Sequence, residues 1–208
     1  MAKEKQERLV SPKGEAKYAW LKNPDTQFNE GGVFKVNLLI PTDECKELCE
    51  KIDAAVDASF EAAKKQAKPA VAKKMVKEYP YGPQLDDDGE EVPGVLEFKF
   101  KMNHTITSRK TGDTFTISPD VFDSKRNKLS PVPAIYGGSI LKVSFVLADY
   151  FMAARAAAGV TLRMNAVQII ELVGGNGATA ATHGFGEEEG YDASDETEEA
   201  SEADSEDF

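Results

Sequence analysis

The stretch LEFKFKMNHTIT, residues 96–107, alternates between apolar and polar side chains. Successive side chains of a β-strand point to opposite faces of a sheet, so this alternation predicts a half-buried strand. Two lysines lie side by side on its open face. The buried face is expected to carry Leu96, Phe98, Phe100, Met102 and Ile106, and the open face Glu97, Lys99, Lys101, Asn103 and Thr105.

Other strand patterns lie on both sides of this segment. VFKVNLLI (33–40) ends at a proline, and SILKVSFVLADYFM (139–152) and GVTLRMNAVQIIELV (159–173) are the last long strands. SRKTGD (108–113) places a glycine at a hairpin position, and TFTIS returns from it. KEYPYGPQLDDDGEEVPG (77–94) follows neither the helix nor the strand period, so we expect an irregular connection there.

The hydrophobic period changes after Pro41 and predicts an amphipathic helix over residues 42–66. Thr42 is the expected N-cap, and the lysines at the far end suit the negative end of the helix dipole. No second cysteine pair completes a zinc site, so we predict that both cysteines are reduced thiols. The apolar face carries Cys45, Leu48, Ile52, Val56, Phe60 and Ala63, with Cys49 beside it.

These elements indicate a mainly β fold. Several short strands with turn signals and one long helix, without a βαβ alternation, predict an antiparallel β-barrel with a helical insertion. A β-sandwich with a peripheral helix is the alternative architecture. We expect the folded domain to span 1–173, followed by a flexible linker at 174–186 and a disordered acidic tail at 187–208.

The net charge of −11 belongs to the C-terminal tail. EEEGYDASDETEEASEADSEDF (187–208) holds twelve Asp and Glu and no Lys or Arg. Removing these twelve from the 36 acids leaves 24 against 25 bases, so residues 1–186 sum to about +1. A near-neutral body with its own basic clusters leaves nucleic acid open as a partner.

Signatures of an enzyme, a metal site or a membrane anchor are missing from the sequence. The chain has no GxxxxGK[ST], GxSxG or HExxH motif, and its two histidines, His104 and His183, are isolated. The acidic DDDGEE run lacks the spacing of an EF-hand. No apolar run reaches the roughly 18 residues of a membrane span, and the charged N-terminus is unlike a signal peptide. We therefore expect a non-enzymatic protein without a cofactor or a metal.

Small basic clusters recur along the chain together with aromatic residues. Single-stranded nucleic acid is bound by cations that follow the phosphates and by rings that stack on bases. The candidate rings are Tyr18, Trp20, Tyr136, Tyr150 and Phe151, unless they fill the barrel core. The cations are Lys3, Lys5 and Arg8 in the N-terminal arm, Lys73 and Lys74 after the helix, Lys99 and Lys101 on the strand, Arg109 and Lys110 in the hairpin, and Lys125, Arg126 and Lys128 in a basic loop.

Several segments together resemble one known family. YAWLKNPD (18–25), which we expect to hold a turn, GGVFKVNLLIP, FKFK, VFDSKRNKLSPVPAIYGGSILKVSF and the acidic end EDF are similar to the single-stranded DNA-binding protein of T-seven-like, short-tailed bacteriophages. The similarity runs over nearly the whole chain, and the tail with its final Phe208 is its most specific part. One departure is that the family can carry an arginine just before VFKV, where this chain has EGG, so that one phosphate contact is lost or supplied from elsewhere.

The resemblance implies a fold, partners and site residues. It implies an oligonucleotide-binding (OB) fold, a five-stranded antiparallel Greek-key barrel with an inserted helix, and a homodimer that coats single-stranded DNA in the cytoplasm of the infected host during replication, recombination and repair. The tail would contact the phage DNA polymerase and the helicase-primase through Asp204, Glu206, Asp207 and Phe208, and would occupy the DNA groove when DNA is absent. Implied DNA contacts are Lys3, Lys73, Lys101 and, by stacking, Tyr150, to which the basic and aromatic pattern adds Lys99, Arg109, Lys110, Lys125, Arg126 and Trp20.

Two other classes of function stay open at this stage. The first is a protein-interaction module whose acidic tail mimics DNA, without DNA affinity of its own. The second is a nucleic-acid enzyme, which is disfavoured because no metal-binding carboxylate constellation lies on the expected ordered elements.

Overall fold

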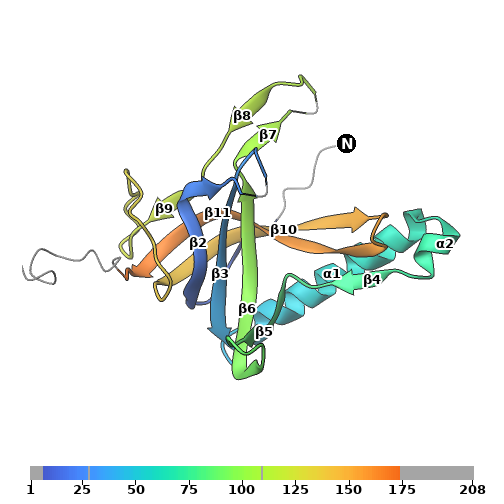
Figure 1. Cartoon of the computed structure of the whole chain (residues 1–208), viewed down its shortest axis with the longest axis horizontal. Helices are drawn as coiled ribbons and strands as arrows, with labels where there is room; N and C mark the ends of the chain where they lie inside the picture. Colours follow the sequence, from blue (N-terminus) through green and yellow to red (C-terminus); the bar gives the residue numbers. More distant parts are fainter. Residues whose placement is uncertain (1–6, 28, 109, 174–208) are drawn as a thin grey trace, which may run out of the picture. The chain divides into compact units, whose positions relative to one another are not determined.

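The computed structural model describes residues 7–27, 29–108 and 110–173, and within them the chain is mainly β (Figure 1). All of these residues belong to one compact unit, Met1–Gly175. The elements are β1 (Leu9–Val10), β2 (Gly14–Asp25), β3 (Val33–Pro41), α1 (Lys46–Gln66), α2 (Pro69–Ala72), β4 (Val76–Glu78), β5 (Tyr81–Leu85), β6 (Glu91–Asn103), β7 (Thr105–Thr107), β8 (Thr114–Thr116), β9 (Asp120–Phe122), β10 (Ile140–Met152) and β11 (Ala157–Glu171).

Five strands pair in a closed ring. The order is β10–β2–β3–β6–β11, and β11 pairs back onto β10 along its whole length. The shorter strands β1, β4, β5 and β9 extend individual members of the ring, and β7 and β8 form a separate hairpin. Ring closure removes the open edges of the long strands and favours the predicted barrel over the alternative of two stacked sheets.

The ring is not antiparallel throughout, which corrects one part of the sequence-based expectation. Four of its pairings are antiparallel, whereas β6 and β11 run parallel where Leu162 faces Phe100 and Arg163 faces Lys101. The reason is geometric. An odd number of strands in a closed ring cannot alternate in direction at every neighbour, so at least one pair must be parallel.

The alternation predicted for 96–107 is confirmed in the part of the strand that faces the core. Phe98 and Phe100 are fully buried, while Lys99 and Lys101 are exposed. Phe100 packs edge-to-face on Phe145 with ring centroids 5.1 Å apart. The strand itself ends at Asn103, and Thr105–Thr107 continues as the separate β7. The core inside the ring is built mainly from Val36, Leu38, Ile40, Phe98, Phe100, Leu141, Val143, Phe145, Leu162, Met164 and Val167.

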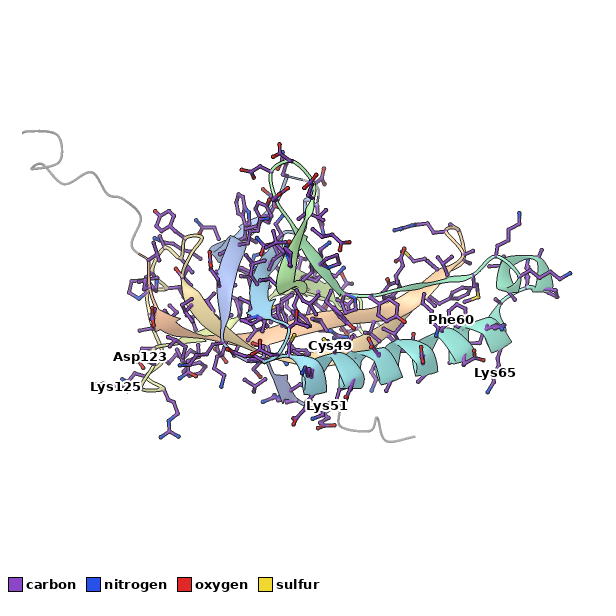
Figure 2. The ribbon with its side chains drawn as sticks, turned by 90° about the horizontal axis from the view of Figure 1, so that it is seen from below. Cys49, Lys51, Phe60, Lys65, Asp123 and Lys125 are labelled. Carbon is purple, nitrogen blue, oxygen red and sulfur yellow. The ribbon has the colours of Figure 1, made fainter. Side chains whose placement is uncertain are left out.

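Helix α1 covers the ring on one side, where it contacts β10 and β11 (Figure 2). Its buried stripe of Leu48, Ile52 and Val56 confirms the predicted amphipathic pattern. The predicted start at Thr42 is wrong, because the helix begins at Lys46. Residues 41–44 form a turn instead, in which the Glu44 N–H donates to the Pro41 carbonyl.

Cys45 is the N-cap residue of α1 and Cys49 lies on its first turn, and both are free, as predicted. Cys45 is fully buried, and burial raises the pKa of its thiol to about 12. Cys49 is half-buried, and burial raises its pKa as well. Their sulfur atoms are 3.9 Å apart. A raised pKa disfavours the reactive thiolate form of both cysteines.

Two segments contain more strand than the sequence predicts. Residues 77–94 hold β4, β5 and the start of β6 around a turn at 86–89, and residues 18–25 belong to β2 rather than to a turn. In β2, irregular pairing between Lys17 and Trp20 coincides with a positive φ of 54° at Tyr18. Short or bulged strands lose the two-residue period, because remote pairing partners hold them in place.

Gly159 lets β4 approach β11 closely. The two strands pair in parallel with Gly159 opposite Glu78, and a Cβ added to Gly159 would lie 2.1 Å from the Glu78 carbonyl oxygen. The Ser59 hydroxyl donates to the Gly159 carbonyl at 2.9 Å, which ties α1 to the same point. The close packing here has no room for a larger residue.

Replacing Gly159 by alanine should therefore destabilise the protein by about 1 to 3 kcal/mol, because the new methyl group must displace a backbone carbonyl. Thermal unfolding followed by circular dichroism measures the effect. Gly82→Ala is the matched control, since nothing lies within 4 Å of its added Cβ. Equal melting temperatures for the two variants would contradict this packing.

Candidate nucleic-acid interface

The open face of β3 and β6 carries pairs of polar side chains in register. Lys35 of β3 lies opposite Lys101 of β6, and Asn37 lies opposite Lys99. The residues between them on each strand, such as Val36 and Phe100, are buried in the core. Alternation along two neighbouring strands therefore places three lysines on one outer surface of the ring.

A row of cations and one ring crosses four strands on this surface. The register pairs Trp20 of β2 with Lys35, Lys35 with Lys101, and Lys101 with Arg163 of β11. Directly paired residues of neighbouring strands project to the same side of a sheet. Trp20 is 44% exposed, so part of its ring is available for contact. The row brings an aromatic face and three cations together.

Lys35 is the member of the row that has a carboxylate partner. Its Nζ lies 2.5 Å from Asp25 Oδ2 and 6.0 Å from the centroid of the Trp20 ring. The hydrogen bond from Lys35 lowers the pKa of Asp25 below its usual value, with a smaller contribution from the Gln27 N–H. Lys99 and Lys101, in contrast, form no ion pair with any described residue, so both ammonium groups are available to an external anion.

A groove of about 580 Å³ lies beside the lysines. One wall comes from β3 and β6, and the other comes from β4, the adjoining ends of β10 and β11 and the turn between them. Figure 1 shows where these strands lie in the fold. The groove is open at its surface, as a site for a polymer must be. Its lining residues that carry charge or an aromatic ring on the surface are Lys35, Lys99, Lys101, Glu78, Tyr79, Tyr150 and Arg155.

Tyr150 enters the groove from β10 with its hydroxyl group anchored. The hydroxyl donates to Glu78 Oε2 at 2.6 Å, and Arg155 Nη2 donates to the other oxygen, Oε1, at 2.6 Å. Burial, followed by the bond to Glu78, raises the pKa of Tyr150 to about 12. The phenol therefore stays protonated at all physiological pH values and keeps its hydrogen bond.

Tyr79 adds a second ring to the same groove. Its side chain is 46% exposed and packs edge-to-face on Tyr81, with ring centroids 6.1 Å apart. Tyr81 in turn stacks on Phe98 at 5.0 Å and donates its hydroxyl to Asp53 of α1 at 2.7 Å. Burial, with the bond to Asp53, raises the pKa of Tyr81. A fixed ladder of rings thus supports an exposed ring at the groove edge.

The structure brings together only part of the predicted contact set. Lys99, Lys101 and Tyr150 line the groove, and Trp20 lies beside it through Lys35. Lys73 caps α2, and Lys110 lies in the β7–β8 turn; both are exposed, and neither lines the groove. Predicted residues outside the described ranges are Lys3, Arg109, Asp204, Glu206, Asp207 and Phe208.

The predicted basic pair Lys125 and Arg126 lies elsewhere on the domain. Both belong to an exposed turn that Asp123 holds by accepting the N–H groups of Lys125 and Asn127, each at 2.8 Å. Figure 2 shows Asp123 and Lys125 at the opposite end from Phe60 and Lys65, which lie at the far end of α1. A DNA contact at this turn stays a prediction and would require a second contact surface.

Sequence reasoning missed five residues of the interface, for two different reasons. Lys35 and Arg163 lie within predicted strands, and counting their two-residue period would have placed both on the open face. Glu78 and Tyr79 fall in the segment that was interpreted as irregular, and Arg155 falls in the connection between the last two predicted strands, so only the folded chain reveals them.

The described residues contain no group of three or more His, Cys, Asp or Glu that could hold a metal ion. His104 has a structural environment, since its Nδ1 lies 2.8 Å from the Ile117 carbonyl and its ring packs edge-to-face on Phe34. Neither helix in the described ranges has the length and apolar character that would let it cross a membrane.

Comparison with known proteins shows which family the chain belongs to. A family model described as the single-stranded DNA-binding protein of bacteriophage T7 matches residues 13–172. The chain belongs to this family. The match spans the whole five-stranded ring and α1, so the resemblance drawn from the sequence is confirmed.

Individual members of this family are similar to this chain in sequence and in structure. The single-stranded DNA-binding protein of Escherichia phage T7 is 34% identical over 195 residues, 88% of this chain and 78% of that protein. Its counterpart from Enterobacteria phage T3 is 32% identical over 175 residues, 77% and 74% of the two chains. The crystal structure of gp2.5, a single-stranded DNA-binding protein encoded by bacteriophage T7, superposes with a TM-score of 0.67 at 30% identity, covering 91% of this chain and 100% of that chain.

Proposed function

We propose that this chain binds single-stranded DNA without sequence preference, along the groove between β6 and β4. The observation that carries the proposal is the register row Trp20, Lys35, Lys101 and Arg163, next to a groove lined by Tyr79 and Tyr150. Cations that follow phosphates and rings that stack on bases are the two components of sequence-tolerant binding. The relatives named above are single-stranded DNA-binding proteins, which supports the same function here.

We assign the five-stranded ring to the OB class. Its support is the ring order with a single parallel closure and the position of α1, inserted between β3 and β6 in the chain. OB barrels bind oligonucleotides across the face of their second and third strands. In this chain those strands are β3 and β6, which carry Lys35, Lys99 and Lys101. The fold and the basic face thus support each other.

The acidic tail is the proposed regulator of this groove. A polyanion tethered to the domain competes with DNA at a high effective concentration, and DNA wins when phosphates and stacked bases together bind better than carboxylates. Binding of DNA then frees the tail for the phage DNA polymerase and the helicase-primase, through Asp204, Glu206, Asp207 and Phe208. In this role the protein acts as a homodimer in DNA replication, recombination and repair, in the cytoplasm of the infected host.

Deleting residues 187–208 should tighten binding to a fluorescent oligo-dT by about tenfold at low salt, because a competitor at millimolar effective concentration is removed. Fluorescence anisotropy of the intact and truncated chains, each at two salt concentrations, measures this. The truncated chain should also lose its affinity for the polymerase. Weaker DNA binding after truncation would contradict tail competition.

Replacing Tyr150 by alanine should cost about 1 to 3 kcal/mol of oligo-dT binding, because a base loses its stacking partner. Tyr150→Phe is the matched control, since it keeps the ring and removes only the hydroxyl that Glu78 holds. If both variants bind DNA normally while the alanine variant melts at a lower temperature, the ring belongs to the core and not to the interface.

The alternative function is a protein-interaction module whose acidic tail mimics DNA. That module would show no affinity of its own for oligonucleotides, with or without residues 187–208. Lys99 and Lys101 favour DNA binding instead. Neither forms an ion pair with a described residue, and a protein that only mimics DNA does not need a cationic groove.

A further inference from the structure

One carboxylate lies within the cationic groove. Among the described residues that line it, four are cations, namely Lys35, Lys99, Lys101 and Arg155, and Glu78 is the single acid. A negative charge in a site for a polyanion weakens binding unless it has another role.

The contacts of Glu78 define that role. Its two carboxylate oxygens accept separate hydrogen bonds, one from Arg155 Nη2 and one from the Tyr150 hydroxyl, both at 2.6 Å. The backbone of Glu78 is held by its parallel pairing with Gly159. The preceding Lys77 points to the other side and binds Asp57 of α1. The position of Glu78 is therefore set by the fold and does not depend on Arg155.

The Arg155 side chain is more exposed to solvent than its partner Glu78. Its side chain is 66% exposed, whereas that of Glu78 is 26% exposed, and Arg155 lies in the turn between β10 and β11. Exposed ion pairs are weak, and a guanidinium group binds phosphate through two parallel hydrogen bonds. A phosphate that enters the groove can thus take the guanidinium from Glu78, while the Tyr150 hydroxyl keeps the carboxylate hydrogen-bonded.

We propose that Arg155 is a further phosphate-binding residue, which Glu78 neutralises until DNA binds. This inference rests on the function proposed above. In the DNA-free groove the pair is neutral and Glu78 orients both Arg155 and Tyr150. When DNA is drawn in by Lys99 and Lys101, Arg155 exchanges its carboxylate for a phosphate. Glu78 thereby limits the affinity of the groove and keeps the stacking ring in place.

The test uses Glu78→Gln in the full-length chain, because glutamine still accepts the Tyr150 hydrogen bond but no longer neutralises Arg155. Oligo-dT affinity should rise roughly eightfold at 50 mM salt and roughly threefold at 200 mM, because loss of the Glu78 charge leaves the groove with about one additional unneutralised positive charge. The double variant Glu78→Gln/Arg155→Gln should return to wild-type affinity and salt dependence. Asp120→Asn is the matched control, because it also removes one acid from an ion pair, with Lys128, outside the groove.

The outcomes separate this inference from the proposed function. The inference fails if the wild type binds oligo-dT and Glu78→Gln binds it no more tightly. It also fails if the double variant keeps the whole increase in affinity, because Arg155 then does not cause that increase. If no form of the chain binds oligo-dT, the proposed function itself fails.

A second measurement applies to the wild type, should Glu78→Gln fail to fold. The side-chain N–H resonances of Arg155, assigned by their loss in Arg155→Lys, should shift when oligo-dT is added to the labelled chain. Unchanged resonances at saturating oligo-dT would overturn the proposal.

Discussion

Replacing Lys99 and Lys101 together by alanine is expected to lower the affinity for oligo-dT roughly sixtyfold at 50 mM salt. Each phosphate contact on a single strand contributes a salt exponent of about 0.7, which corresponds to roughly eightfold at that concentration. Neither lysine has a carboxylate partner among the described residues. Their removal therefore costs two phosphate contacts without leaving an acid unpaired.

The control for this variant is Lys125→Ala/Arg126→Ala. It removes the same charge from an exposed turn that does not line the groove. If DNA contacts the groove alone, the change is less than about threefold, because salt screens charges beyond roughly 10 to 15 Å at this ionic strength. A larger loss would support the contact that the sequence predicts at this turn. Equal losses in the two double variants would mean that net charge, rather than the groove, governs binding.

Raising the salt concentration should weaken the wild type strongly. The four cations on the open face of the ring, Lys35, Lys99, Lys101 and Arg163, would neutralise about four phosphates. The slope of log K against log salt is then roughly −2.8, or close to fiftyfold between 50 and 200 mM. Fluorescence anisotropy with oligo-dT over this range gives the slope directly.

A flat salt response would contradict a phosphate-binding groove. The double variant of Lys99 and Lys101 provides an internal check, because two lost contacts should reduce the slope to roughly −1.4. A variant that lost affinity but kept the wild-type slope would show that the lysines act on the fold and not on phosphates.

The sequence predicts the ring strands β3, β6, β10 and β11 well because each has one face in the core, whereas it misses β2. Phe98 and Phe100 alternate with Lys99 and Lys101, and that two-residue period is local information. Which strands become neighbours is not local. Closure of β11 on β6 joins residues far apart in the chain, and hydrophobic patterning cannot choose their partner or their direction.

The candidate site divides in the same way. Lys99 and Lys101 could be predicted because a strand pattern places them on an open face. The Glu78–Arg155 pair could not, since it joins a short edge strand to a turn 77 residues away. Tyr150 has one feature that could be predicted and one that could not. Its ring was predicted to stack on a base, but its anchoring by Glu78 is visible only in the folded chain.

The most direct test of the central claim is photo-crosslinking of the full-length chain to an oligonucleotide that carries 5-iodouracil, followed by peptide mapping. Iodouracil couples to aromatic rings that contact the base. The account predicts adducts on Tyr79, Tyr150 and Trp20, which lie in or beside the groove. Phe115 and Tyr136 are similarly exposed, at 48% each, but do not line it. Adducts on those two rings without any in the groove would contradict the account.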